Sequence, residues 1–176
     1  MLVLKIAILI TLLFIAFQDF KYKAVLWIWF PILFLLIISK EITELGINTS
    51  LNYFIFNLSF IIVQLILLTF YFSVKHKKLI NIINKILGLG DILFLVALAA
   101  YFSPINFILF LISSLTIVLI TYGLGLIFNK IQNKQIPLAG AIAIIMFLLV
   151  LIDCFPNNIN YYNDTPIINL LDLSNA

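Results

Sequence analysis

Six long apolar segments, separated by short polar connections, make up most of the 176 residues of this chain. Most of them approach the ~20 residues that an α-helix needs to cross a ~30 Å hydrocarbon core. Apolar and polar residues do not alternate within them, as the strands of a transmembrane barrel would require. The sequence therefore predicts an all-α polytopic membrane protein, a bundle of six transmembrane helices. The segments span residues 2–17, 24–38, 51–72, 86–102, 105–128 and 136–152.

The composition places the chain outside the range of soluble domains. Hydrophobic residues make up 65% of it and charged residues 10%, whereas about a quarter of the residues in a soluble domain are charged. Residues 1–153 are predicted to form one membrane domain, and residues 154–176 a polar tail, outside the membrane and loosely ordered. Cys154 is the single cysteine, which excludes an intramolecular disulfide and a cysteine-based zinc site. We expect neither a metal nor another cofactor.

Lysines mark one side of the predicted bundle. The net charge of the chain is +3, and its lysines lie in short connections between apolar segments. Lysines in such places are typical of topology signals, and they indicate a lipid bilayer as the partner rather than a nucleic acid. Eight of the ten lysines occupy alternate connections, so these connections are expected to face the cytoplasm and both termini to lie outside. A cleaved signal peptide is the disfavoured alternative for the first segment, because lysines follow it and Phe14-Ile15-Ala16 departs from an A-x-A-like cleavage site. The eight are Lys21, Lys23, Lys75, Lys77, Lys78, Lys85, Lys130 and Lys134.

On this map only two of the seven acidic residues face the cytoplasm. Asp19 ends the first segment and Asp91 begins the fourth. Both lie at a membrane boundary, where an ionisable group is by default a functional candidate because placing it there costs free energy. Helix packing could bring the two carboxylates together. The other five, in the first outer loop or at and beyond the outer end of the sixth segment, are Glu41, Glu44, Asp153, Asp164 and Asp172.

Each carboxylate also has an ordinary structural interpretation. Asp91 follows Gly88-Leu89-Gly90, and a glycine turn followed by an aspartate is typical of a capped helix N-terminus. Asp19 is at a helix C-terminus, where the dipole disfavours a negative charge. Pairing with Lys21 or Lys23, or exposure to water, would account for it there.

As a pair, the two residues predict a different chemistry. Two carboxylates at contact distance cannot both ionise and so share a proton, as in an aspartic-protease dyad. The ionised member takes a proton from water, which attacks an amide carbonyl, and the protonated member gives its proton to the developing oxyanion. Gly88 and Gly90 would let a substrate backbone approach Asp91 closely.

The motif Gly88-Leu89-Gly90-Asp91 at the start of the fourth of six helices, with Asp19 ending the first, resembles the type IV prepilin peptidases. These are membrane aspartic peptidases that share the G-x-G-D motif with presenilin-type proteases. Asp19-Phe20-Lys21-Tyr22-Lys23 resembles the family's first catalytic position with its following basic residues. Ile136-Pro137-Leu138-Ala139-Gly140 resembles the Ile-Pro-containing stretch that opens the last helix of the family.

The resemblance implies Asp19 and Asp91 as catalytic residues, with Gly88, Gly90 and Pro137 supporting the motifs. It implies cleavage of prepilin-like or pseudopilin precursors at the cytoplasmic face of the bacterial inner membrane. Two family features differ here. The Ile-Pro pair usual about seven residues after the first aspartate is replaced by a region containing Ala24-Val25, and the insert with paired CxxC motifs is absent. We therefore predict a short, peptidase-only form without methyltransferase activity.

Two other functions are compatible with the sequence. One is an inactive member that retains the fold. The other is a small-molecule-binding membrane subunit of a transporter, which would need polar groups converging in a pocket at mid-membrane depth or on the outer side. The candidates for such a pocket, of which the first three are also expected to form interhelical hydrogen bonds, are Asn52, Asn57, Gln64, Ser113 and Ser114.

Overall fold

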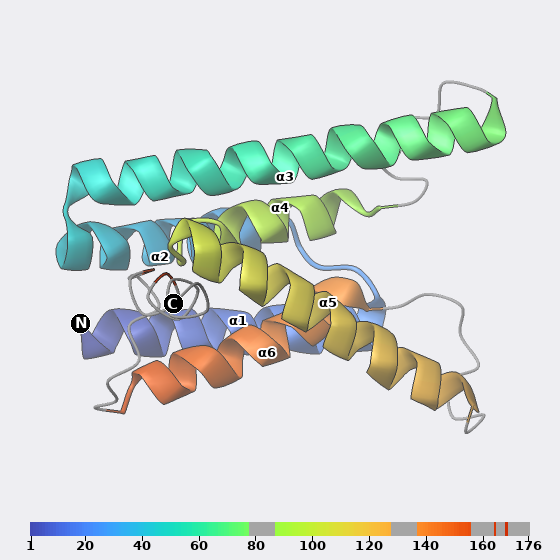
Figure 1. Cartoon of the computed structure of the whole chain (residues 1–176). Helices are drawn as coiled ribbons and strands as arrows, with labels where there is room; N and C mark the ends of the chain where they lie inside the picture. The colour runs from blue at the N-terminus through green and yellow to red at the C-terminus, as the bar shows by residue number, and fades with distance from the viewer. Residues whose placement is uncertain (78–86, 128–136, 156–163, 165–167, 169–176) are drawn as a thin grey trace, which may run out of the picture.

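A computed structural model of the chain describes residues 1–77, 87–127, 137–155, 164 and 168. Within these residues the chain forms six α-helices (Figure 1). Some predicted features lie outside the described residues: the connection lysines Lys78, Lys85, Lys130 and Lys134, the motif residue Ile136, and Asp172 with most of the tail. The helices are α1 (Leu2–Tyr22), α2 (Trp29–Leu45), α3 (Ile47–His76), α4 (Leu89–Leu98), α5 (Pro104–Ile127) and α6 (Leu138–Asp153).

The prediction of an all-helical chain with six helices is confirmed for the described residues. By length and apolar composition, three of the helices can cross a membrane: α1, α3 and α5, the last over Pro104–Gly125. The apolar helices α4 and α6 are shorter. At 1.5 Å per residue, the 30 residues of α3 exceed the ~30 Å hydrocarbon core. A crossing by all six helices stays a prediction.

The boundaries of the second helix were predicted wrongly. Residues 24–28 precede α2, and a turn there is held by the Leu26 N–H, which donates to Gln18 Oε1 at 3.0 Å. The helix then continues well past residue 38, to Leu45. Glu41 and Glu44 therefore belong to the last turns of α2 and not to an outer loop. The extension is possible because buried partners satisfy its polar side chains.

Helices α2 and α4 form a layer between α3 on one side and α1 with α6 on the other (Figure 1). Helix α1 packs along α6 and α2, and α2 in turn packs against α4 and α3, while α5 contacts α6 and α3. In Figure 1, α3 lies on one side of α2 and α4, and α1 and α6 lie on the other. The inward stripe of α1 is formed by Ile8, Leu12 and Ile15, all fully buried, at the spacing of one helix face. Its outward face is also apolar, with Ile10 and Leu13 exposed, as expected for a helix that contacts lipid.

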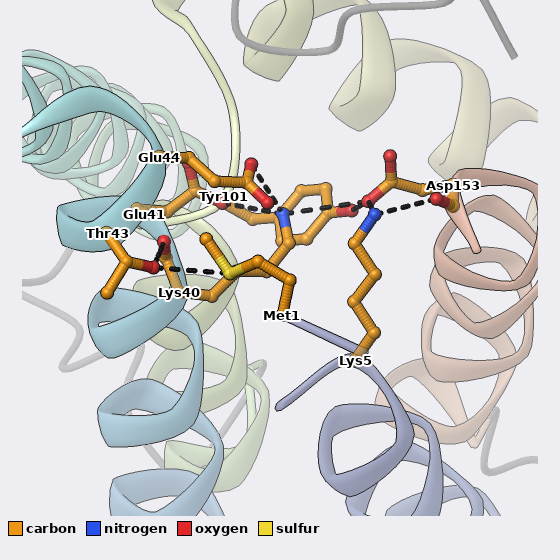
Figure 2. Close-up of polar contacts among 8 residues, drawn as sticks. All are labelled: Met1, Lys5, Lys40, Glu41, Thr43, Glu44, Tyr101 and Asp153. Carbon is orange, nitrogen blue, oxygen red and sulfur yellow. Dashed lines mark hydrogen bonds and ion pairs between the residues drawn. The ribbon is translucent and has the colours of Figure 1, made fainter. Parts of the chain in front are cut away.

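An ionic cluster closes the end of the bundle near the N-terminus (Figure 2). Its centre is the fully buried ammonium group of Lys40 in α2, which lies 3.2 Å from Glu41 Oε1, 3.4 Å from Glu44 Oε2 and 3.6 Å from Asp153 Oδ2. The ring of Tyr101 covers the same ammonium group, with its centroid 4.4 Å away. Buried charges persist in an apolar bundle only where such partners surround them.

The same cluster connects α1 to α6. Lys5 Nζ lies 3.0 Å from Asp153 Oδ2 and donates a hydrogen bond of 2.7 Å to the Asp153 carbonyl oxygen. Because Asp153 is the last residue of α6 and Lys5 is in the first turns of α1, the two helices run antiparallel. The Tyr101 hydroxyl donates to Asp153 Oδ2 at 3.0 Å, and this bond links the segment that follows α4 to the same cluster.

Replacing Lys40 with methionine is expected to destabilise the protein by about 3–5 kcal/mol, because Glu41 is left buried without its cation. Lys75→Met is the matched control: Lys75 also lies over a tyrosine ring, that of Tyr71, but its side chain is exposed. Unfolding of the detergent-solubilised variants measures the difference. Equal stability of the two variants would contradict the structural role given to the cluster.

Asn57 of α3 secures the connection between α4 and α5. Its amide group donates to the carbonyl oxygens of Ala99 and Phe102 at 2.9 and 2.8 Å, and its side chain is buried. The prediction that Asn57 bonds to another part of the bundle is therefore right in part, because its acceptors lie in the turn between α4 and α5 and not in a helix. Among the other polar candidates, Asn52, Gln64 and Ser113 are exposed, while Ser114 is buried and donates to a carbonyl of its own helix, that of Leu111.

Asn57→Leu is expected to cost about 1–2 kcal/mol, since two buried carbonyl groups lose their donor. Asn52→Leu makes the same chemical change on an exposed face of the same helix and should be close to neutral. Thermal unfolding of both variants in detergent provides the comparison. A larger loss for Asn52→Leu than for Asn57→Leu would show that the assignment is wrong.

Candidate functional site

Asp19 lies in the last turn of α1, buried with 7% of its surface exposed. Helix α1 continues past it to Tyr22 and ends at Lys23, which has the left-handed φ of 51° and donates its N–H to the Asp19 carbonyl oxygen. The side chain of Asp19 faces α6, where its Oδ2 accepts the N–H of Gly140 at 2.5 Å.

Of the two cations predicted as alternative partners for Asp19, Lys21 has contacts with aromatic rings. The ammonium group of Lys21 lies over the rings of Phe17 and Tyr22, 5.2 and 5.1 Å from their centroids. Exposure to water does not account for Asp19 either, since its side chain is buried. What the structure does provide for this carboxylate is a backbone amide of another helix.

Asp91 is the third residue of α4, and the helix N-cap is Gly88. The interpretation of Asp91 as the N-cap is therefore wrong. Its carboxylate reaches back to accept the N–H of Gly88, and it also accepts the N–H of Ala139 from α6. The backward bond resembles one half of a capping box, in which an acidic side chain at the third position satisfies the N-cap amide.

Both aspartates thus meet at the N-terminus of α6. Asp19 holds the amide of Gly140 and Asp91 holds the adjacent amide of Ala139. The carboxylates lie close enough for the charge of one to act on the other. Pro137, the N-cap of α6, has no side-chain atom able to cap the helix, so two distant helices supply the acceptors that its first amides need. The positive end of the α6 dipole adds a favourable interaction with negative charge.

Missing side chains make room for these contacts. A Cβ atom on Gly88 would lie 3.1 Å from Asp91 Oδ2, and one on Gly140 would lie 3.0 Å from both Cβ and Oδ2 of Asp19. At Gly90 the nearest atoms would belong to the Phe30 ring at 3.6 Å, an ordinary contact. Among the described residues, Gly46 is the one glycine with a positive φ. Gly88 and Gly140 therefore serve close approach rather than an unusual backbone conformation.

Sequence reasoning named Asp19, Asp91, Gly88, Gly90 and Pro137 and assigned no role to Ala139 or Gly140. A signal for these two was present, because a helix that opens on a proline needs acceptors from elsewhere for its next amides.

Comparison of the chain with protein-family models, with curated proteins and with solved structures gives no match. The resemblance to prepilin peptidases rests on the motifs quoted above and stays a prediction.

Substituting either aspartate tests whether the carboxylates cap α6. Asn retains an acceptor oxygen and Ala does not, so Asp19→Ala and Asp91→Ala should each lose about 0.5–2 kcal/mol of stability, whereas the Asn variants should lose less. Chemical unfolding in detergent measures all four. If each Asn variant were as unstable as its Ala counterpart, hydrogen bonding to the amides could not be the stabilising contact.

Proposed function

We propose that this chain is a membrane-embedded aspartic endopeptidase with Asp19 and Asp91 as its catalytic dyad. The observation that carries the proposal is the convergence of the two residues. They come from separate helices, they are held on adjacent amides of α6, and each is within the electrostatic reach of the other. Two such carboxylates at a helix end in an apolar bundle are the minimum that hydrolysis by an aspartic dyad requires.

The two carboxylates share one proton, so that one acts as the base and the other as the acid. The ionised member removes a proton from a water molecule as the water oxygen attacks the amide carbonyl, and the protonated member donates to the oxygen on which charge develops. When the tetrahedral intermediate collapses, the C–N bond breaks and the leaving amine takes the proton that the first carboxylate removed from water. The hydroxyl formed on the former carbonyl oxygen returns its proton to the second carboxylate, which restores the shared proton of the dyad. The amides of Ala139 and Gly140 keep both side chains in place throughout. No metal takes part in this mechanism.

The substrate follows from the resemblance to prepilin peptidases and from the position of the site. We propose that six helices cross the bacterial cytoplasmic membrane with both termini outside, so that the dyad faces the cytoplasm. The substrates are prepilin-like or pseudopilin precursors, with a short basic leader ending in glycine before a hydrophobic helix. Lys21 and Lys23, which end α1 close to Asp19, support this orientation by the positive-inside rule.

The second candidate is a protein that retains the fold without activity. It is favoured by the fact that capping α6 would by itself explain why both carboxylates are where they are. A charge is not needed for that task, since asparagine caps a helix about as well as aspartate. Hydrolysis, in contrast, needs ionisable groups at both positions. The wild-type protein therefore separates the two functions, because only the peptidase cleaves a precursor and only the peptidase has an activity that an asparagine variant can lose.

Cleavage of a precursor of this type, co-reconstituted with the protein in lipid vesicles, tests the proposal. Asp19→Asn and Asp91→Asn should each lower the rate by at least about 100-fold, because each removes a proton-transfer group, while both remain folded. Glu44→Gln neutralises a carboxylate at the opposite end of the bundle and should leave the rate near that of the wild type.

Cleavage at the wild-type rate by either asparagine variant would overturn the mechanism. Absence of cleavage by the wild-type protein, across the precursors encoded near it, would favour the inactive alternative. Co-purification of a small molecule with the folded protein would instead favour the transporter subunit.

A further inference from the structure

The first turn of α6 is in tight contact with the last turn of α1. A Cβ atom on Gly140 would lie 3.0 Å from Asp19 Cβ, 3.0 Å from Asp19 Oδ2 and 3.3 Å from Phe20 Cδ2. Carbon atoms in good contact are about 3.5–4.0 Å apart, so three atoms would have to move to admit a single methyl group.

Rotation of the Asp19 side chain cannot relieve this contact. A carboxylate oxygen can swing away, but Cβ is bonded directly to the backbone and moves only with α1 itself. Helix α1 is held along α6 by packing and, at the other end, by the Lys5–Asp153 pair. A side chain at position 140 would therefore push the end of α1 outward and move Asp19 with it.

The position of Asp91 would not follow. Its carboxylate is bonded to the amides of Gly88 and Ala139, and α4 packs against α2 and α6. Displacing Asp19 alone changes the separation of the two carboxylates. The missing side chain at position 140 thus sets the spacing of the pair.

We propose that Gly140 is a positioning residue of the dyad, which fixes Asp19 at working distance from Asp91 through its amide and its lack of a side chain. The inference rests on the proposed peptidase function. Gly140 does not touch the substrate, so its substitution should reduce the rate of chemistry and leave substrate binding intact.

Gly140→Ala tests this with the same precursor in vesicles. The contact requires Asp19 to move by a few tenths of an ångström. Because a 1 Å misplacement near a catalytic group can cost about 100-fold, we expect kcat to fall by about 10-fold, with KM within about twofold of the wild type. Gly123→Ala is the matched control, because a Cβ there meets nothing within 4 Å. Both kinetic constants of the control should be unchanged.

Wild-type kcat in Gly140→Ala would overturn the inference while leaving the peptidase proposal intact. A fall in kcat with an equal rise in KM would overturn it too, since a general loss of the binding fold affects both. Failure of the wild-type protein to cleave would instead overturn the function on which the inference rests.

A second measurement covers the case in which Gly140→Ala does not fold. Gly140 is the only one of the six glycines that follows an alanine, so labelling with 13C-carbonyl alanine and 15N-glycine gives one assigned amide signal. Asp19→Ala should move this proton signal upfield as its hydrogen bond is lost, and Glu44→Gln should not. An unchanged signal in Asp19→Ala would overturn the proposed contact.

Discussion

The need to satisfy polar groups inside an apolar bundle governs this structure. Seven of the charged residues form two groups, at opposite ends of α1 and α6. At one end Lys40 lies among Glu41, Glu44 and Asp153. At the other, Asp19 and Asp91 accept the amides that Pro137 leaves uncapped. Each group depends on partners from other helices, so packing and polar contacts form together.

The two ends differ in chemistry as well as in place. The ionic cluster sets two cations, Lys5 and Lys40, against three carboxylates and a tyrosine hydroxyl. The carboxylates of Asp19 and Asp91 are bonded to neutral amides and act on each other. A proton shared between two acids has no equivalent in an ion-pair network, in which lysine neutralises the charge. For this reason the proposed chemistry belongs to Asp19 and Asp91 although the other end holds more acidic residues.

The length and continuity of the apolar segments predicted the six helices, and charge asymmetry singled out Asp19 and Asp91 among seven acids. Local pattern did not predict that α2 would extend to Leu45, because the buried Lys40 has partners in α6 and in the segment after α4. The capping of α6 could not be predicted from the local sequence either. It depends on which distant carboxylates reach the amides of Ala139 and Gly140, and that is decided by tertiary packing.

Helices α1 and α6 are fastened to each other at both of their ends, by Lys5 with Asp153 and by Asp19 with Gly140. Two helices held in this way resist sliding past each other and separating, so α1 and α6 act as one rigid unit. Asp91 is on α4, a helix of only ten residues that is not part of this rigid unit. In the proposed peptidase, any movement that admits a peptide between the two carboxylates therefore has to come from the side of α4, with Asp19 stationary and Asp91 approaching it.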